Sequence, residues 1–356
     1  MTTVAEFKIE FLQYLDSEGK PISTLPDFAN DSNILLSLYK EMVKTRLFDA
    51  KAVALQRTGK MGTFPSSLGQ EAVAVGMGHA MAQEDIFCPY YRDQGAMFMR
   101  GVSMQEILAY WGGDERGSDF KGPRQDFPIA VPVASQCLHA TGCAYAIKYR
   151  KEKRAVVTTV GDGGTSKGDF YEAMNLAGDW NLPVVFIINN NQWAISVPLA
   201  AQTHTKTLAQ KAIAAGFEGI QVDGNDVIAV REAVARALKR AKEGNGPTLI
   251  EAITYRLCDH TTADDAKRYI EGACIESAWI NEPIKRLYNY LMEHNLWSKE
   301  QEEELKQGFS EEIDAAVSEY LNMPPQPATS ILAYHYESWP TNLQDQWDEL
   351  GAIDNA

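Results

Sequence analysis

Residues 155–196 read AVVTTVGDGGTSKGDFYEAMNLAGDWNLPVVFIINNNQWAIS, and this stretch decides the fold. Two runs in it, AVVTTV (155–160) and VVFIIN (184–189), are short and rich in β-branched residues, which indicates strands buried on both faces. Residues 169–180 between them are predicted to be helical. A strand, a helix and a second strand form one βαβ crossover, whose two strands lie parallel and can be neighbours.

The alternation of strands and helices continues on both sides of this unit. The further elements expected are helices at 34–55, 66–82, 208–215, 227–242, 276–295 and 298–321, and strands at 219–222 and 248–255. Such a pattern predicts an α/β fold, a parallel sheet with helices on both faces. Ligands of such sheets bind at the carboxyl ends of the strands, so we expect the functional residues just after positions 160, 189 and 255.

Three regions are expected along the chain. Residues 1–30 form an N-terminal arm that ends in the turn-rich SEGKPISTLP, residues 31–275 form the α/β domain, and residues 276–356 form C-terminal helices and a tail. Residues 257–268 (LCDHTTADDAKR), between the last strand and the C-terminal helices, are polar and without periodicity, which predicts a loop.

The composition argues against several classes of protein. A formal net charge of −15 and a pI of about 4.9 argue against nucleic-acid binding and against a polybasic membrane contact, since both need a basic surface. No apolar run has the length of a membrane span, and MTTVAEFKIEFLQYL at the start has the pattern of neither a secretory signal nor a mitochondrial transit peptide. The five cysteines are odd in number and include no C-x-x-C pair, so we expect no disulfide framework and a reducing compartment, the cytoplasm.

The first strand is followed by the glycine-rich turn GDGG (161–164), which leads into a helix. Glycines let backbone N–H groups approach a ligand, and a helix N-terminus favours an anion, so the turn predicts a phosphate site. It is not a Walker A loop, because Asp169 follows Gly168, and it is not a full dinucleotide loop, because Ser166 takes the place of the third glycine. Asp162 would repel a phosphate unless a cation lay between them, and Mg²⁺ takes carboxylates together with phosphate oxygens.

The second strand ends in Asn189, Asn190 and Asn191, which offer neutral oxygen ligands. Asn191 lies 29 positions after Asp162 (191 − 162), which is the length of one crossover. Because the carboxyl ends of neighbouring parallel strands share one edge of a sheet, the two side chains are expected close together. The sequence therefore predicts a magnesium and phosphate site built from both strand ends.

GDG, then about thirty residues, then NN is a pattern that resembles the thiamine diphosphate motif. More widely, the chain resembles the E1 α subunits of the pyruvate and branched-chain 2-oxo acid dehydrogenases, and the pyruvate branch most. The other matching segments are GTFPSSLGQEAVAVG (62–76), YYRDQGAMFMRG (90–101), VDGND (222–226) and TYRLCDHTTADD (254–265). The resemblance covers nearly the whole chain and implies a thiamine-diphosphate-binding fold, in which residues 31–275 bind the diphosphate.

The resemblance also implies roles for particular residues. Mg²⁺ would be held by Asp162, the side chain of Asn191 and the backbone carbonyl of Trp193. The diphosphate would lie along Gly161, Gly163 and Gly164, within reach of Tyr91 and Arg92. The aminopyrimidine would contact the backbone of Val131 and Val133. Ser135 and Gln136 match a potassium site of the branched-chain relatives, but Ala130 departs from that pattern.

His260 matches the family's histidine on the mobile loop near the cofactor. It would orient the diphosphate region and move a proton when the lipoyl group is acylated, work that suits the ordinary pKa of an imidazole. Relatives carry a kinase-regulated serine directly after this histidine, but Thr261 stands there in this chain, so that regulation is not expected.

The glutamate that activates the aminopyrimidine belongs, in this family, to a pyrimidine-binding domain that the chain lacks. The resemblance therefore implies a site shared with an E1 β subunit in an α2β2 heterotetramer. The implied reaction is the oxidative decarboxylation of pyruvate, with transfer of the acetyl group to the lipoyl group of an E2 acyltransferase. The helix containing AMNLAGDW (173–180) could pack its small residues either against another subunit or within the chain.

Three alternatives remain open at this stage. The substrate could be a branched-chain 2-oxo acid or acetoin, since much of the pocket lies on the second chain. A Rossmann-type nucleotide-binding module would leave Asp162 and Asn191 unexplained and would require glycine at position 166. A non-catalytic subunit without cofactor would have no use for the intact GDG and NN segments.

Overall fold

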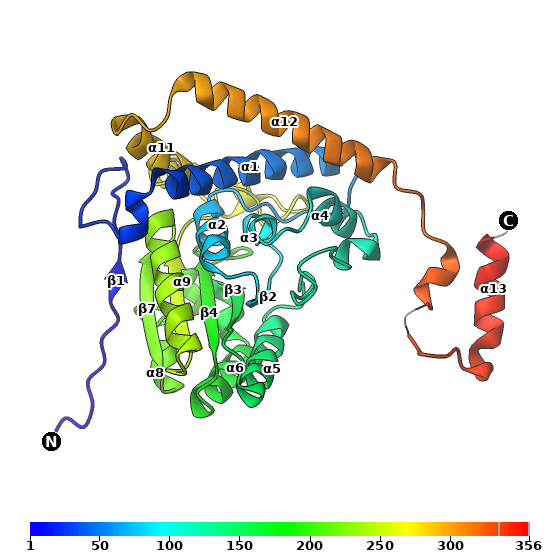
Figure 1. Ribbon diagram of the computed structural model, residues 1–356, viewed down its shortest axis with the longest axis horizontal. Coiled ribbons are helices and arrows are strands. Elements are labelled where there is room, and N and C mark those ends of the chain that lie inside the picture. Colours follow the sequence, from blue (N-terminus) through cyan, green and yellow to red (C-terminus); the bar gives the residue numbers. More distant parts are fainter. Residues whose placement is uncertain (334, 355–356) are drawn as a thin grey trace.

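The computed structural model describes residues 1–333 and 335–354, and its centre is a parallel sheet of six strands. The strand order is β1-β7-β8-β4-β3-β2 (Figure 1). The strands are β1 (Phe11–Leu12), β2 (Ile86–Cys88), β3 (Val156–Gly161), β4 (Val184–Asn190), β7 (Glu218–Asp223) and β8 (Thr248–Ile253), and a separate antiparallel pair is formed by β5 (Trp193–Ala194) and β6 (Val197–Pro198). Every pairing within the large sheet is parallel, which confirms the predicted fold class.

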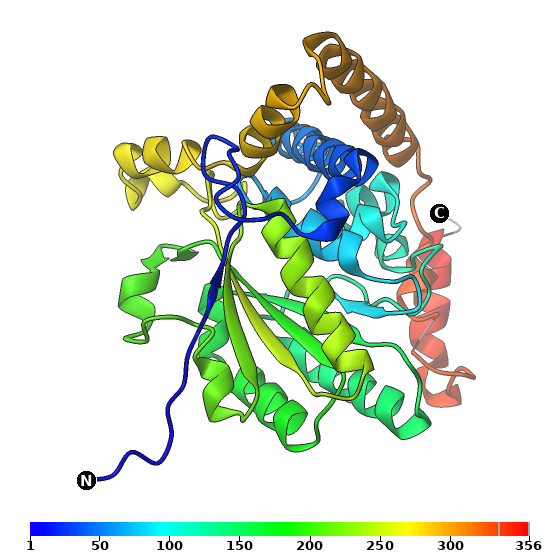
Figure 2. The same cartoon turned by 60° about the vertical axis from the view of Figure 1, so that its left-hand side comes forward.

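Helices cover both faces of the sheet, as Figure 1 and Figure 2 show from two sides. The α-helices are α1 (Ser32–Arg57), α2 (Glu71–Ala80), α3 (Gln94–Met99), α4 (Met104–Trp111), α5 (Ser135–Arg150), α6 (Gly168–Asp179), α7 (Leu199–Gln202), α8 (Lys211–Ala214), α9 (Val227–Lys242), α10 (Gly272–Trp279), α11 (Pro283–Glu293), α12 (Lys299–Leu321) and α13 (Gln344–Asp354). The 3₁₀ helices are η1 (Asp27–Asn30), η2 (Glu115–Ser118), η3 (Asp162–Ser166), η4 (Ala266–Arg268), η5 (Ala328–Ile331) and η6 (Thr341–Leu343). Among the described helices, none combines the length and the apolar character needed to cross a membrane.

The strands divide their side chains between two separate cores because successive residues of a strand point to opposite faces. Val185 and Ile187 of β4 join the core under α1, α2 and α9, whereas Phe186 and Ile188 join the core under α5 and α6. Both strands predicted to be buried on two faces, β3 and β4, behave in this way, so their uniformly apolar sequence is explained.

Several helix boundaries differ from those expected. The helix predicted from residue 66 begins at Glu71, because residues 68–69 form a turn in which Gly69 has a φ of +90°. The single helix expected at 276–295 is two helices, and the second begins where the side chain of Glu282 caps the backbone N–H groups of α11. The short helix α8 replaces the longer one expected at 208–215.

The small residues of α6 pack within the chain. Ala173 and Ala177 are fully buried, and a Cβ at Gly178 would lie 2.0 Å from the carbonyl oxygen of Ala215. Of the two possibilities left open for this helix, the structure shows intrachain packing for its small face.

The five cysteines are all free thiols, as their odd number and spacing led us to expect.

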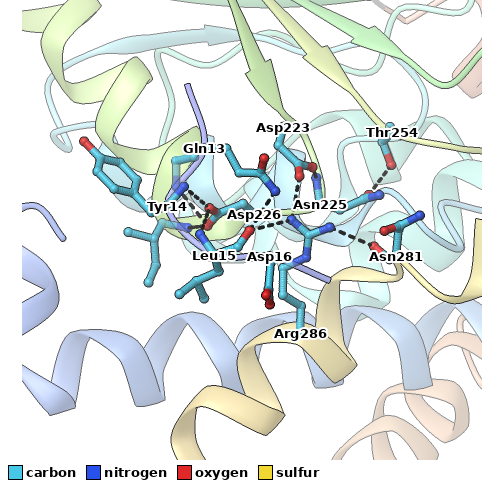
Figure 3. Close-up of polar contacts among 12 residues, drawn as sticks. Gln13, Tyr14, Leu15, Asp16, Asp223, Asn225, Asp226, Thr254, Asn281 and Arg286 are labelled. Carbon is cyan, nitrogen blue, oxygen red and sulfur yellow. Dashed lines mark hydrogen bonds and ion pairs between the residues drawn. The ribbon is translucent and has the colours of Figure 1, made fainter. Parts of the chain in front are cut away.

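The N-terminal arm joins the sheet instead of lying loose, since β1 pairs with β7. A buried carboxylate, Asp226, fixes it: Asp226 Oδ2 accepts the backbone N–H groups of Tyr14 and Leu15 at 2.7 and 2.8 Å (Figure 3). Beside it, Arg286 of α11 donates to Asp223 Oδ2 at 2.6 Å and to the carbonyl of Leu15 at 3.2 Å. The VDGND segment (222–226) is therefore a junction between the arm, the sheet and the C-terminal helices.

At the other end of the chain, α13 packs on η5 and lies apart from the sheet in Figure 1.

Candidate functional site

The residues singled out from the sequence gather at the carboxyl ends of four adjacent strands, β2, β3, β4 and β8. In the register of the sheet, Gly161 at the end of β3 lies opposite Asn189 of β4, and Asn190 lies opposite Ile253 of β8. Asp162 and Asn191, which follow directly, are thereby brought to the same edge. The expectation that their strands are neighbours is confirmed.

The glycine turn after β3 is closely packed. A Cβ at Gly163 would lie 2.5 Å from that of Ala194, and a Cβ at Gly164 would lie 2.4 Å from a methyl group of Val160. Neither glycine has a positive φ, so the need for glycine here is one of space and not of backbone conformation. Gly161, by contrast, faces open space, because no atom lies within 4 Å of a Cβ added there.

Asp162 is a buried carboxylate without a cationic hydrogen-bond partner. It is 2% exposed, and burial raises the pKa of its carboxyl above the usual value. Oδ2 accepts a hydrogen bond from Gln202 Nε2 at 2.8 Å, and Oε1 of the same Gln202 amide is buried with no partner among the described residues. A buried negative charge beside an unused carbonyl oxygen is costly unless a cation joins them.

Asn191 and Trp193 form the opposite wall of the turn. Asn191 Nδ2 donates to Gln70 Oε1 at 3.0 Å, while its Oδ1 accepts the backbone N–H of Trp193 at 3.2 Å. The indole N–H of Trp193 donates to Tyr255 Oη at 3.0 Å, and β5, which contains Trp193, packs on η3. Oxygen atoms from Asp162, Asn191 and the Trp193 backbone thus belong to segments in mutual contact.

Two guanidinium groups are buried at this edge, those of Arg92 and Arg256. Arg92 donates to the carbonyls of Ser66 and His260 at 2.6 and 2.7 Å and to His260 Nδ1 at 2.9 Å. Arg256 donates to the carbonyls of Ile195 and Cys258 and to the hydroxyl of Tyr269. All of these hydrogen-bond partners are neutral, so among the described residues neither guanidinium is neutralised by a direct carboxylate contact. Two such cations close together, both in contact with His260, favour an anion.

His260 is enclosed by these arginines. Burial, together with the charges of Arg92 and Arg256, lowers its pKa to about 3. This differs from the ordinary imidazole pKa expected from the sequence, because the loop folds His260 against two cations instead of leaving it in solvent. Since Nδ1 accepts from Arg92, the proton of the neutral ring is assigned to Nε2, which is left free to donate.

The other residues predicted for the site lie around this centre. Tyr91 packs against His260, with ring centroids 6.3 Å apart, and its ring also faces the guanidinium of Arg92. Val131 and Val133 are 48% and 47% exposed, and Val133 contacts the glycine turn at Gly164. Ser135 Oγ donates to the carbonyl of Pro132 at 2.8 Å, and Gln136 donates to that of Thr159 at 2.6 Å while its own Oε1 is buried without a partner.

Sequence reasoning missed Arg256 and Gln202. Arg256 stands four residues before His260 in the quoted TYRLCDHTTADD segment, so a strand-end position beside a predicted site residue was the available signal. Gln202 offered no signal, since only the turn of β5 and β6 brings α7 back to Asp162. Within the described ranges no group of three or more His, Cys, Asp or Glu side chains could hold a metal, so a cation here would depend on amide and backbone oxygens beside one carboxylate.

The chain belongs to the dehydrogenase E1 component family, whose model matches residues 39–329. It is 38% identical to the pyruvate dehydrogenase E1 component subunit alpha of Mycoplasma genitalium over 334 residues, which cover 94% of this chain and 93% of that relative. The subunit of the same name from Staphylococcus aureus strain Mu50 is 37% identical over 345 residues, covering 96% and 92% of the two chains. The resemblance stated from the sequence motifs is thereby confirmed.

Proposed function

We propose that this chain is the α subunit of a pyruvate dehydrogenase E1 component, which decarboxylates pyruvate oxidatively and acetylates the lipoyl group of an E2 partner. The observation that carries the proposal is that a buried carboxylate, Asp162, and two buried guanidinium groups lie at the same edge of the sheet without forming ion pairs within the described residues. Thiamine diphosphate with Mg²⁺ would satisfy both, since Asp162 would help to hold the cation and the guanidinium groups would balance the charge of the diphosphate. The names of the curated relatives favour pyruvate over a branched-chain 2-oxo acid or acetoin.

The residues present fit thiamine diphosphate and Mg²⁺. The Mg²⁺ ligands we propose are Asp162, the side chain of Asn191 and the backbone carbonyl of Trp193. The residues we propose to bind the diphosphate are Tyr91, Arg92, Gly161, Gly163 and Gly164, to which we add Arg256. Val131 and Val133 remain the residues proposed to contact the aminopyrimidine. When bound, the cofactor supplies an electron sink for decarboxylation. The potassium site at Ser135 and Gln136 stays a prediction, supported by the unpartnered Gln136 Oε1.

His260 acts first as a hydrogen-bond donor in this scheme. Without an anion its ring is neutral, with Arg92 bound at Nδ1 and the proton on Nε2. A bound diphosphate would offset the charges of Arg92 and Arg256, whereas burial, the largest cause of the lowered imidazole pKa, would remain.

A second chain completes the site in our proposal, as an E1 β subunit in an α2β2 heterotetramer. The support is apolar surface beside the glycine turn, where Val131 and Val133 are half exposed. Exposed aromatic side chains also lie on α5 and just after α6, where Tyr145 is stacked on Tyr149 and makes a tilted contact with Trp180. Patches of this kind mark interaction sites. The five free thiols are compatible with the proposed cytoplasmic location.

The test is reconstitution with the candidate β chain. Decarboxylation of pyruvate and of 3-methyl-2-oxobutanoate is measured with thiamine diphosphate and Mg²⁺, with the α chain alone and the Asp162→Ala pair as controls. Activity of the wild-type pair alone, with pyruvate preferred, is the expected result. Preference for the branched substrate would keep the mechanism and change the substrate. Activity of the isolated α chain, or of the Asp162→Ala pair, would overturn the shared, magnesium-bridged site.

A further inference from the structure

We propose that Asp49, on the long helix α1, is a positioning residue that holds Arg92 and His260 in place through the crosspiece formed by residues 64–67. The inference rests on the proposed function insofar as Arg92 and His260 serve the cofactor. Asp49 itself touches neither of them, so its effect is indirect. The chain of contacts runs from α1 to the crosspiece and from the crosspiece to the loop that contains His260.

The first link joins Asp49 to the crosspiece. Asp49 is 4% exposed, and its Oδ1 accepts the backbone N–H of Ser67 at 2.6 Å, while its Oδ2 accepts the hydroxyl of Ser66 at 2.5 Å. The hydroxyl of Ser67 adds a third hydrogen bond at 3.2 Å. Bonds to an ionised carboxylate are stronger than neutral ones, so this segment is held at one point by a charge.

The second link joins the crosspiece to the site. The carbonyl of Ser66 accepts from Arg92 Nη1 at 2.6 Å, and Arg92 Nη2 donates to the carbonyl and Nδ1 of His260. Two residues earlier, Phe64 exchanges hydrogen bonds with Thr262: Thr262 N donates to the carbonyl of Phe64 at 2.9 Å, and Phe64 N donates to Thr262 Oγ1 at 3.0 Å. The crosspiece therefore fixes the loop at His260, through Arg92, and at Thr262 two residues further on.

The cost of burying this charge argues for a role other than packing. Burial raises the pKa of Asp49 to about 6, and its hydrogen-bond partners are serine hydroxyls and a backbone N–H, with no cation among them. The titratable groups that face it are Glu71 of α2, which is paired with Arg46 at 2.8 Å, and Cys258 of the loop, whose pKa burial raises to about 11. Burying a neutral side chain here would cost less free energy than burying a carboxylate. We therefore attribute the carboxylate to the hydrogen bonds by which it holds Ser66 and Ser67.

The first readout is the order of the loop without cofactor. The full chain, co-purified with its β chain and free of thiamine diphosphate, is treated with trypsin, and cleavage after the exposed Lys267 and Arg268 is followed by mass spectrometry. Asp49→Asn and, from the other side of the same contact, Ser66→Ala are each expected to speed this cleavage by about tenfold, as the loop opens more often.

A matched control separates positioning from general loss of stability. Asp226 is also a buried carboxylate that accepts backbone N–H groups and whose pKa burial raises, but it holds the N-terminal arm. Asp226→Asn is expected to lower the melting temperature without faster cleavage at 267–268. Unchanged cleavage in both Asp49→Asn and Ser66→Ala, or equal acceleration in Asp226→Asn, overturns the proposal. Because this readout involves no cofactor, its failure is distinct from failure of the proposed function.

The second readout is the pH dependence of thiamine diphosphate binding in the presence of Mg²⁺, measured by calorimetry relative to the wild type. A neutral carboxyl accepts hydrogen bonds more weakly, so the affinity advantage of wild type over Asp49→Asn should be largest near pH 8 and vanish as the pH falls below about 6. A merely structural role predicts a difference that is independent of pH. A constant difference would therefore overturn the positioning role even if cleavage increased.

Discussion

Two buried aspartates follow strands of the same sheet, and they are used in opposite ways. Asp226, after β7, accepts two backbone N–H groups of the N-terminal arm and two of its own helix, Ile228 and Ala229 (Figure 3). Asp162, after β3, accepts a side-chain hydrogen bond from Gln202 and lies beside an amide oxygen that has no partner within the described part of the chain. Burial raises the pKa of both carboxyls.

We call Asp223, Asp226 and Arg286 the Asp226 corner, and Asp162, Arg92 and Arg256 the Asp162 corner. The arginines of these two corners differ in the same way as the aspartates. Arg286, near Asp226, forms an ion pair with Asp223 at 2.6 Å, whereas Arg92 and Arg256, near Asp162, have neutral hydrogen-bond partners. A corner whose charges satisfy one another stabilises the fold, and a corner whose charges remain unpaired is prepared for a ligand.

The largest expected effect is on stability at the Asp226 corner. Asp226→Ala removes a helix cap and leaves buried N–H groups of the arm without an acceptor, so the free energy of unfolding should fall by about 3–4 kcal/mol. Urea denaturation of the α chain with its β chain measures this. The affinity for thiamine diphosphate of the protein that remains folded should be unchanged, and a large loss of affinity would place this corner in the ligand site.

The next effect is on ligand binding at the Asp162 corner. Loss of a residue that only hydrogen-bonds a metal ligand typically weakens metal binding by about 10–100-fold. Asp162→Ala removes a proposed ligand itself, so it should weaken magnesium-dependent binding of thiamine diphosphate by more than roughly a hundredfold. The midpoint of urea denaturation without cofactor should not fall, because the lost carboxylate was buried without a cation. A destabilised variant with normal affinity would reverse the roles assigned to the two aspartates.

The arginines give a smaller contrast. Arg256→Met is expected to weaken thiamine diphosphate binding by about tenfold, as one charge-assisted contact to the diphosphate is lost. Arg286→Met is the matched variant, which should lower stability because it leaves Asp223 unpaired, with no change in affinity. Calorimetric titration and thermal denaturation of both variants decide the matter, and equal affinity in the two would remove Arg256 from the site.

The smallest effect is a pH dependence of stability due to His260. Its pKa is lowered in the folded state, so the unfolded chain alone takes up the proton as the pH falls below about 6.5, and stability is lost progressively toward the folded pKa of about 3. Between about pH 7 and pH 5 this amounts to roughly 1 kcal/mol after allowance for solvent screening.

Comparison with His260→Asn isolates the imidazole contribution. Asp49 titrates in the same range with the opposite sign, because its raised pKa makes the folded state lose stability as the pH rises from about 4 to about 6. Because Asp49 is present in both proteins, its contribution cancels in the comparison. The difference between the melting temperatures of wild type and variant should shrink as the pH falls, since the contribution of His260 is lost. A difference that does not change with pH would show that His260 is not held neutral.

The sheet and half of the site were predictable because both depend on local patterns. β-branched runs fix buried strands, and the spacing of Asp162 and Asn191 follows from the length of one crossover. Residues 66–70 were predicted as helix because their small residues satisfy the helical pattern, whereas their backbone instead bonds to loop residues such as Leu257. Arg256 and Gln202 were missed because their importance lies in what surrounds them.

The sequence by itself determined the α/β class, the order of its main strands along the chain and the position of the GDG and NN segments, since periodicity and glycine placement are local properties. Only the tertiary structure decided which charges are paired. Asp162 and Asp226 look alike in sequence, each an aspartate close to a glycine just after a strand. Whether a buried charge finds a partner depends on segments hundreds of residues away, such as the arm that reaches Asp226, and that difference separates the ligand site from the scaffold.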